Sequence, residues 1–318
     1  MNRLLLGVAL VALGAALFGT LSYLSRGASA AGLDALPYVA WRGLIATVAL
    51  LGVSLAVGRR VGGERSFPDL RVLARDRRIA LIVAALVGAM LNIAVFAAFL
   101  RTTVAVALIC FYTFPAMVTL AAVPLYGDRL NAVRIGALVL SSVGLALVVL
   151  APLAGASGVV LDPIGIGLAL FGAVCQAVFV LIAGRGFKPL PTLHVSTIVV
   201  FAAFALSFPL ALLVGDFEGL LRPLGQVDPW FWILAGGLIG AAIPTTAFIA
   251  GIGIIGPSRA AILMTIEPLV GVTLAALLLG EHPLPLQVVG GAGVLVAAAI
   301  LQVSPRAPVP PESEIPIV

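Results

Sequence analysis

The sequence predicts an all-α integral membrane protein with ten transmembrane helices, built as two inverted five-helix repeats around a central cavity. The first observation is composition: hydrophobic residues make up 62% of the 318 residues and charged residues only 10%, whereas soluble domains carry about 25% charged residues. The second is a series of apolar runs of membrane-spanning length. The third is an internal duplication. Mean hydropathy is +1.23, so a soluble catalytic domain is excluded.

Ten apolar runs of about twenty residues match the roughly 30 Å hydrocarbon core, because a helix rises about 1.5 Å per residue. They cover residues 4–23, 36–57, 79–100, 103–126, 132–150, 164–183, 193–214, 230–252, 257–279 and 284–302. The first run also resembles a signal peptide, since Arg3 precedes it. We favour a span because this run has a repeat partner.

The second half of the chain matches the first at six ordered positions. Leu86-Val-Gly-Ala89 matches Leu238-Ile-Gly-Ala241, Pro115 matches Pro268, Gly127-Asp128 matches Gly280-Glu281, Gly136 matches Gly290, Leu36-Pro37 matches Leu190-Pro191, and Gly14-Ala15 matches Gly172-Ala173. Five spans is an odd number, so the second repeat enters the membrane from the opposite face, as in many secondary transporters. We expect repeats at 1–151 and 164–303, a linker at 152–163 and a disordered cytoplasmic tail at 304–318.

The arginines fix the orientation. With the N-terminus in the cytoplasm, fourteen Lys and Arg residues fall in inside segments and three in outside loops, which is the positive-inside bias. The excess of basic residues therefore orients the chain in the lipid bilayer and does not indicate nucleic-acid binding. We expect a multi-pass protein of the bacterial inner membrane with both termini cytoplasmic.

Glu267 is the only carboxylate well inside an expected span. Ionisable groups at membrane depth are costly, so each is a candidate functional group. Two interpretations stay open. Glu267 either exchanges protons or binds a substrate amine, or it caps backbone groups beside Pro268 or pairs with an arginine.

Arg42 lies six residues inside the second span, next to Trp41. An arginine there can extend to the membrane surface, pair with an acid, or bind a carboxylate through two hydrogen bonds. Trp41 suits an interfacial belt, and both residues are candidates for the substrate cavity.

Prolines interrupt spans four, eight and nine at Pro115, Pro244 and Pro268. Such paired interruptions point to transporter sites, so we name these three as hinge or kink candidates, with packing kinks as the alternative. Thr245 follows Pro244 in span eight, and Asn92 is the position in span three that matches Pro244. Both are cavity candidates.

Four further side chains are candidates for lining a cavity that accepts an amphiphilic solute: Phe18, Phe111, Tyr112 and Gln176. Packing against a neighbouring helix is the alternative for each. We expect no metal site and no cofactor, because the chain has two histidines, two cysteines within spans, and no Gly-x-x-x-x-Gly-Lys loop for nucleotide phosphates. We therefore expect that the protein is not an enzyme.

These residues resemble the EamA branch of the drug/metabolite transporter superfamily. Pro37 with Trp41-Arg42 is similar to its second-helix pattern, and Ser258-Arg-Ala-Ala261, Glu267-Pro-Leu269, Gly280-Glu281, Gln287 and Gly290 are similar to its signature in helices nine and ten. The first half repeats the pattern from Phe111 to Pro115. Leu17-Phe-Gly-Thr20 resembles a first-helix motif that usually carries Trp at the Phe18 position. The resemblance covers residues 4–302.

The resemblance implies export of metabolites from the bacterial cytoplasm through a basket-like ten-helix bundle, and it implies a general scaffold role for Glu267-Pro268. Amino-acid exporters of the YddG type are our preferred subclass. We expect export of amino acids, aromatic or hydrophobic and with broad specificity allowed, by alternating access of a monomer. The alternatives are a proton-coupled exporter of lipophilic drugs and, in another class, a membrane enzyme or assembly factor.

Overall fold

In the computed structural model, the described residues are 3–60, 70–102, 104–127, 131–151, 161–187, 190–279 and 284–303, and they are helical with short connections. The first half contains α1 (Arg3–Gly19), α2 (Leu21–Ala30), α3 (Ala35–Arg60), η1 (Leu70–Val72), α4 (Arg75–Arg101), α5 (Val104–Phe111), α6 (Phe114–Tyr126) and α7 (Ala132–Leu150). The second contains α8 (Pro163–Arg185), α9 (Thr192–Leu213), α10 (Phe217–Gly225), α11 (Asp228–Gly237), η3 (Leu238–Ala242), α12 (Ile243–Ile255), α13 (Pro257–Leu263), α14 (Ile266–Leu279) and α15 (Pro285–Val303).

The helices confirm the predicted fold class. Eight helical segments of the described chain are long and apolar enough to cross a membrane, and the α13–α14 segment and α15 complete the ten spans. The expected spans agree with these helices to within a few residues, except that the first continues through α2 to Ala30. The short helices η1 and α10 were not predicted. Most of the predicted linker and all of the predicted tail lie outside the described residues.

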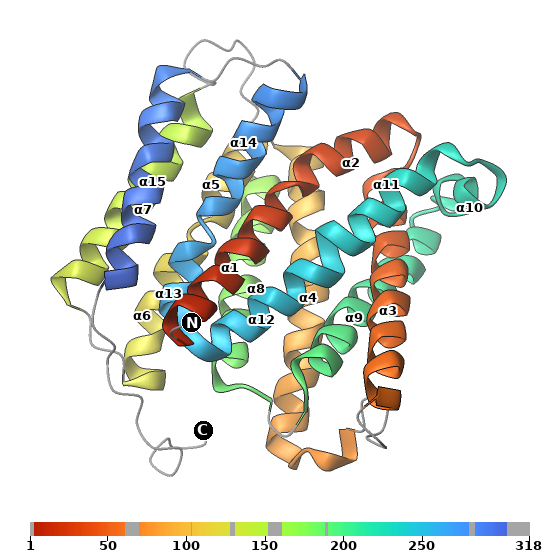
Figure 1. Ribbon diagram of the computed structural model, residues 1–318. Helices are drawn as coiled ribbons and strands as arrows, with labels where there is room; N and C mark the ends of the chain where they lie inside the picture. The colour runs from red at the N-terminus through yellow and green to blue at the C-terminus, as the bar shows by residue number, and fades with distance from the viewer. Residues whose placement is uncertain are drawn as a thin grey trace.

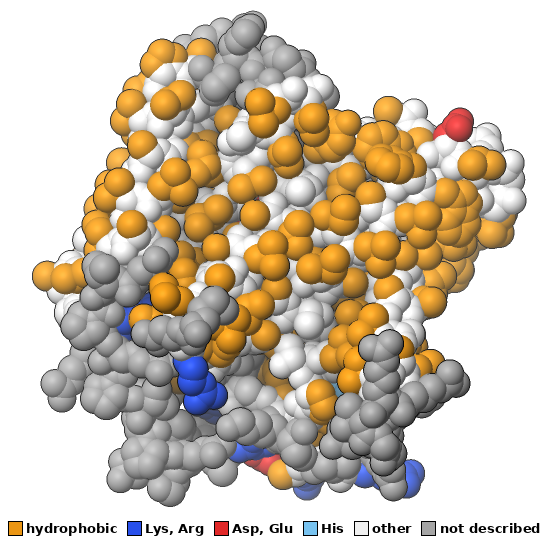
Figure 2. Space-filling view, viewed as in Figure 1, with side chains coloured by type: hydrophobic (Ala, Val, Ile, Leu, Met, Phe, Trp, Pro, Cys, Tyr) orange, Lys and Arg blue, Asp and Glu red, His pale blue; other side chains and the backbone are white. Residues whose placement is uncertain are grey.

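Hydrophobic side chains cover the visible face of the bundle, as a lipid-facing surface requires, and Lys and Arg gather toward one end (Figure 2). The lower end in Figure 1 carries η1 and the start of α4, with the exposed arginines Arg71 and Arg75. This asymmetry is the pattern expected of a membrane protein in a fixed orientation.

The main helix pairs join the two halves of the chain, and the repeat relates these pairs to one another (Figure 1). Helix α1 packs on α12, and α8 packs on α4. These two pairs are equivalent, because α8 is the repeat partner of α1 and α12 is that of α4. In the pairs α3–α9 and α7–α15, each helix packs on its own repeat partner. In the last pair, a Cβ on Gly290 would lie 2.4 Å from the Gly144 carbonyl oxygen. Only glycine allows this approach, which is the usual means of tight helix packing in membranes.

Several spans are interrupted rather than continuous. Span four breaks between α5 and α6, and span nine breaks between α13 and α14. Pro115 and Pro268 follow these breaks, within the first turn of α6 and α14. The missing N–H of proline is harmless in a first turn, where no intrahelical acceptor exists. Span eight contains the π-type turn η3, which ends at Ala242, two residues before Pro244.

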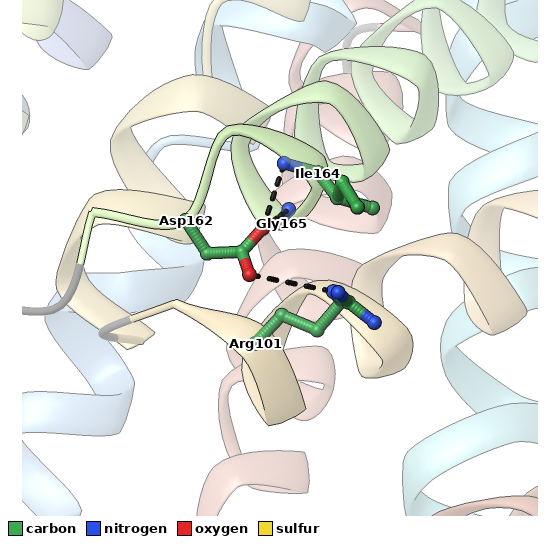
Figure 3. A network of polar contacts seen from close by, with 4 residues as sticks. All are labelled: Arg101, Asp162, Ile164 and Gly165. Atoms are coloured by element: carbon green, nitrogen blue, oxygen red, sulfur yellow. Dashed lines mark hydrogen bonds and ion pairs between the residues drawn. The ribbon is translucent and has the colours of Figure 1, made fainter.

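Helix α8 begins at the N-cap Asp162, just before the expected span at 164–183 (Figure 3). The Asp162 carboxylate accepts hydrogen bonds from the Ile164 and Gly165 backbone N–H groups at 2.7 and 2.9 Å and pairs with Arg101 at 3.6 Å. The Gly165 N–H, with smaller contributions from Ile164 and Arg101, holds the pKa of Asp162 below its ordinary value. The cap ties the start of the second repeat to the end of α4.

Candidate functional site

A cavity of about 680 Å³ lies in the bundle, and all ten spans contribute to its lining. Ligand cavities of small-molecule sites have volumes of about 300–1,000 Å³. Only one part of each long helix borders the cavity. In α4, for example, Leu81 and Ala84 are fully buried in the core, whereas Gly88 and Asn92, further along, line the cavity.

The core closes the other end of the bundle. In α1, Val8 and Val11 are buried in this core, whereas Phe18, further along the helix, lines the cavity. In α12 the order is reversed: Phe248 lines the cavity, and the later residues Ile252 and Ile255 are buried in the core. The cavity thus extends from the middle of the spans toward the end that carries α2.

Most of the residues predicted for the cavity do line it. They are Phe18, Arg42, Asn92, Phe111, Tyr112, Gln176, Thr245 and Glu267, joined by the hinge candidate Pro268. Trp41 is not in the lining: its indole N–H donates to the Leu220 carbonyl at 3.0 Å and its ring packs edge-on against Trp230. The helix turn that points Arg42 inward directs its neighbour toward α10, because consecutive helical residues face different sides.

Arg42 is anchored to both repeats. Its side chain is 5% exposed. One terminal nitrogen donates to the Asn92 Oδ1 at 2.6 Å and the other to the Gly240 carbonyl at 3.5 Å. Tyr38 and Phe96 present their rings to the guanidinium carbon at 5.8 and 5.9 Å.

The two acceptors of Arg42 stand at equivalent places in the two repeats. Gly88 corresponds to Gly240, and Asn92 corresponds to Pro244, both 152 residues apart. The Asn92 amide donates to the Gly88 carbonyl at 2.8 Å. Pro244 has no N–H to donate to the carbonyl four residues earlier, which is Gly240. Arg42 therefore supplies the hydrogen bond that proline removes.

No carboxylate neutralises Arg42 within the described part of the chain. The ion pairs found there are Arg101–Asp162 and Arg222–Glu218, and the Arg42 Nε has no hydrogen-bond partner. A buried cation normally has an acidic partner, because burying an unpaired charge is costly. Arg42 is thus a cation that faces a cavity with donor capacity left over.

Glu267 approaches the cavity from another wall. It belongs to α14, which packs on α1, α2, α7 and α15, whereas Arg42 belongs to α3, which packs mainly on α9, α11 and η3 and only slightly on α2. Its half-buried carboxyl lies beside the Tyr112 hydroxyl, its hydrogen-bonding neighbour. Among the described residues it forms neither an arginine pair nor a backbone cap, the two structural roles considered from the sequence.

Polar groups without partners also face the cavity. The Gln176 amide and the Thr245 hydroxyl line the cavity, and neither makes a hydrogen bond to the described protein residues. The hydroxyl of the neighbouring Thr246, in contrast, donates to the Ala242 carbonyl. These groups can bind a solute or water. The remaining lining is mainly aliphatic and aromatic, including Phe179 and Phe248, whose rings stack at 6.5 Å.

Sequence reasoning missed four polar lining residues: Tyr23, Ser25, Arg26 and Gln287. The first three lie on α2. Tyr23 is the last residue of the expected first span, and Ser25 and Arg26 lie beyond it, where a loop was expected. Gln287 was noted only as part of a family signature. It donates to the Val148 carbonyl at 3.1 Å and accepts from the Leu284 N–H at 2.8 Å. A search for polar residues at and just beyond both ends of each span would have found all four.

Comparison with known proteins agrees with this architecture. A solved structure titled "Crystal structure of protein" is similar with a TM-score of 0.71 and 20% identity, covering 95% of this chain and 97% of the other, which shows a shared fold. Comparison with curated proteins gives no match. The family model of the EamA-like transporter family matches residues 5–150 and again residues 163–303, one match for each half. The chain therefore belongs to the EamA-like transporter family, multi-pass membrane proteins of the drug/metabolite transporter superfamily.

Proposed function

We propose that the protein is a secondary exporter of amino acids, with aromatic and hydrophobic side chains preferred, and that it works by alternating access between its two repeats. The observation that carries this proposal is Arg42, a buried guanidinium that faces the cavity without an acidic partner. An arginine fork matches the two oxygens of a carboxylate. A bound α-carboxylate would neutralise the charge.

The rest of the cavity suits the other parts of an amino acid. Apolar walls formed by residues such as Phe18, Phe111 and Phe179 provide a surface for a hydrophobic side chain. Glu267, on a different wall from Arg42, offers a negative charge for the α-ammonium. Gln176 and Thr245 supply neutral hydrogen-bonding groups that allow several side chains, which supports broad specificity.

We place both termini in the cytoplasm of a bacterial cell and the protein in its inner membrane, on the basis of the arginine asymmetry. In this orientation the end that carries α2 faces outward, and the core that closes the other end of the bundle faces the cytoplasm. A monomer suffices for this mechanism because all ten spans of one chain line the cavity.

Uptake into proteoliposomes tests the proposal. Labelled phenylalanine, threonine and methionine should enter vesicles containing the protein faster than empty vesicles, and Arg42→Gln should reduce this uptake. Uptake that never exceeds empty vesicles for any of the three would refute an amino-acid transporter.

The apolar lining also favours a second candidate, proton-coupled export of lipophilic drugs, with Glu267 as the coupling group. This candidate predicts uptake of hydrophobic cations that is insensitive to Arg42→Gln and abolished by Glu267→Gln. A membrane enzyme or assembly factor would instead convert or bind its substrate without any solute flux.

A further inference from the structure

The short helix α10 connects α9 to α11 at the end of the bundle that carries α2 (Figure 1). Three of its bulky side chains, Phe217, Leu221 and Leu224, are 55, 60 and 69% exposed. Their spacing of four and three residues places them on one side of the helix, the apolar face of α10. Val214 before α10 and Val227 after it are exposed as well and extend this surface. A contiguous exposed apolar surface of this kind indicates a partner.

The other two faces of α10 have different surroundings. Gly219, Leu220 and Pro223 are buried, and the helix packs on α3, α9 and α11. Glu218 and Arg222, one turn apart, form an ion pair at 3.6 Å, and the Glu218 side chain is 91% exposed. At about 100° of rotation per residue, the apolar, charged and buried faces lie roughly 120° apart. A helix that lies along a membrane surface against its own protein meets three such environments, namely acyl chains, water and protein.

The tryptophans of the chain mark the level of this surface. All three, Trp41, Trp230 and Trp232, lie on the helices α3 and α11, which α10 contacts. The indole N–H of Trp41 donates to the Leu220 carbonyl at 3.0 Å. The indole N–H of Trp230 donates to the Pro223 carbonyl at 2.7 Å. Tryptophan is enriched where the bilayer meets water, so these contacts place α10 at the depth of the membrane interface.

We propose that the apolar face of α10 is a lipid-binding surface, inserted into the boundary between headgroups and acyl chains of the leaflet on the α2 side. In the orientation proposed above this is the outer leaflet. The face is continuous with the lipid-facing surface of the spans through the exposed side chains of Leu213 on α9 and Phe231 on α11. Figure 2 shows hydrophobic side chains gathered over α11 and beside it at this end. The inserted side chains reach about 5–10 Å into the boundary, as in interfacial helices, while Glu218 and Arg222 stay at the water side.

A second copy of the chain fits this face less well than lipid does. Helices in membranes associate through small residues that let their backbones approach closely, whereas the apolar face of α10 presents a phenylalanine and two leucines. The helix has nine residues, which is about 13 Å of length. Its face is therefore much smaller than the roughly 800 Å² that each partner buries in a stable protein interface.

Environment-sensitive labels on the full-length protein in phosphatidylcholine–phosphatidylglycerol vesicles test the inference. In a background that carries Cys110→Ala and Cys175→Ala, Leu221→Cys or Leu224→Cys is labelled with nitrobenzoxadiazole. These labels should emit at shorter wavelength than in water, and lipids with a nitroxide in the upper acyl chain should quench them. Glu218→Cys, on the charged face of the same helix, is the matched control. Its label should emit as in water and be quenched by iodide in solution.

Water-like emission at all three labelled positions would overturn the lipid contact. Lipid-like emission at Leu221→Cys that disappears when the protein is diluted with lipid would assign the face to a second copy, and would overturn it too. If the cysteine-free background does not fold, wild type decides: a lipid with a diazirine in its upper acyl chain should form adducts on residues 217–227. Adducts on the spans but none on this segment would contradict the proposal. None of these measurements involves a substrate, so their outcome is independent of the proposed function.

Discussion

Replacing Arg42 tests whether this residue recognises a carboxylate. Arg42→Gln removes the charge while leaving an amide that can still donate one hydrogen bond. Hydrogen bonds to charged groups contribute about 1.5–3 kcal/mol, and each 1.4 kcal/mol is tenfold in affinity. Phenylalanine binding should therefore weaken about 10- to 150-fold. The phenylalanine affinity of Arg42→Lys should fall between those of wild type and Arg42→Gln, because lysine keeps the charge but lacks the planar fork.

The assay compares phenylalanine with phenylalanine amide, which has the same ring and ammonium but no carboxylate. Calorimetry with purified Arg42→Gln should show a large loss of affinity for phenylalanine and little change of affinity for phenylalanine amide. Arg222→Gln is the matched control, because Arg222 lies outside the cavity and pairs with the exposed Glu218 at 3.6 Å. Equal weakening of the acid and the amide would refute the reasoning.

The same substitution has a structural cost that must be measured separately. Arg42 donates to Asn92 and to the Gly240 carbonyl, and an unsatisfied buried polar group costs about 1–3 kcal/mol. A glutamine at position 42 can replace only some of these hydrogen bonds. Thermal unfolding of each variant in detergent shows whether a loss of binding is a loss of fold. A variant with unchanged unfolding and weakened acid binding supports recognition.

Three further substitutions test the scaffold. Gly290→Ala should destabilise the α7–α15 pair by about 1–3 kcal/mol through overpacking, since its Cβ would lie 2.4 Å from the facing carbonyl; Gly136→Ala on α7 meets nothing within 4 Å and serves as the control in thermal unfolding. Pro244→Ala restores an N–H to the carbonyl four residues earlier, so the π-type turn should shorten to an α-helix, with slower amide exchange there and slower transport; unchanged exchange would argue against this. Asp162→Ala removes the N-cap of α8. Because hydrogen bonding lowers the pKa of Asp162, its stabilisation is present above the ordinary carboxyl pKa and is lost as pH falls below it. The melting temperatures of wild type and Asp162→Ala should therefore differ at neutral pH and converge in acid.

The fold could be predicted from the sequence because the bilayer restricts the choices. A span must be helical and apolar over its whole length, so hydropathy located all ten spans. The end of the first span was harder, since Arg26 and three serines mark residues 21–30 as polar although α2 continues there. These side chains are accommodated because several face the cavity instead of lipid. Hydropathy alone cannot distinguish a lipid-facing surface from a cavity wall.

The candidate site could be predicted only in part. Polar residues in apolar runs identified Arg42, Asn92 and Glu267, and all three line the cavity. The bond between Arg42 and Asn92 joins residues 50 positions apart in different spans, and no local pattern encodes such a pairing. Trp41 was named because it adjoins Arg42, but neighbours in a helix point in different directions. Its hydrogen bond to the Leu220 carbonyl depends on α10, a helix that the sequence had not revealed.

A structure of the protein with phenylalanine bound would test the central claim most directly. We expect the ligand carboxylate within hydrogen-bonding distance of the Arg42 guanidinium, the ammonium beside Glu267 and Tyr112, and the ring against the apolar wall. A ligand outside the cavity, or one in the cavity whose carboxylate makes no contact with Arg42, would contradict it.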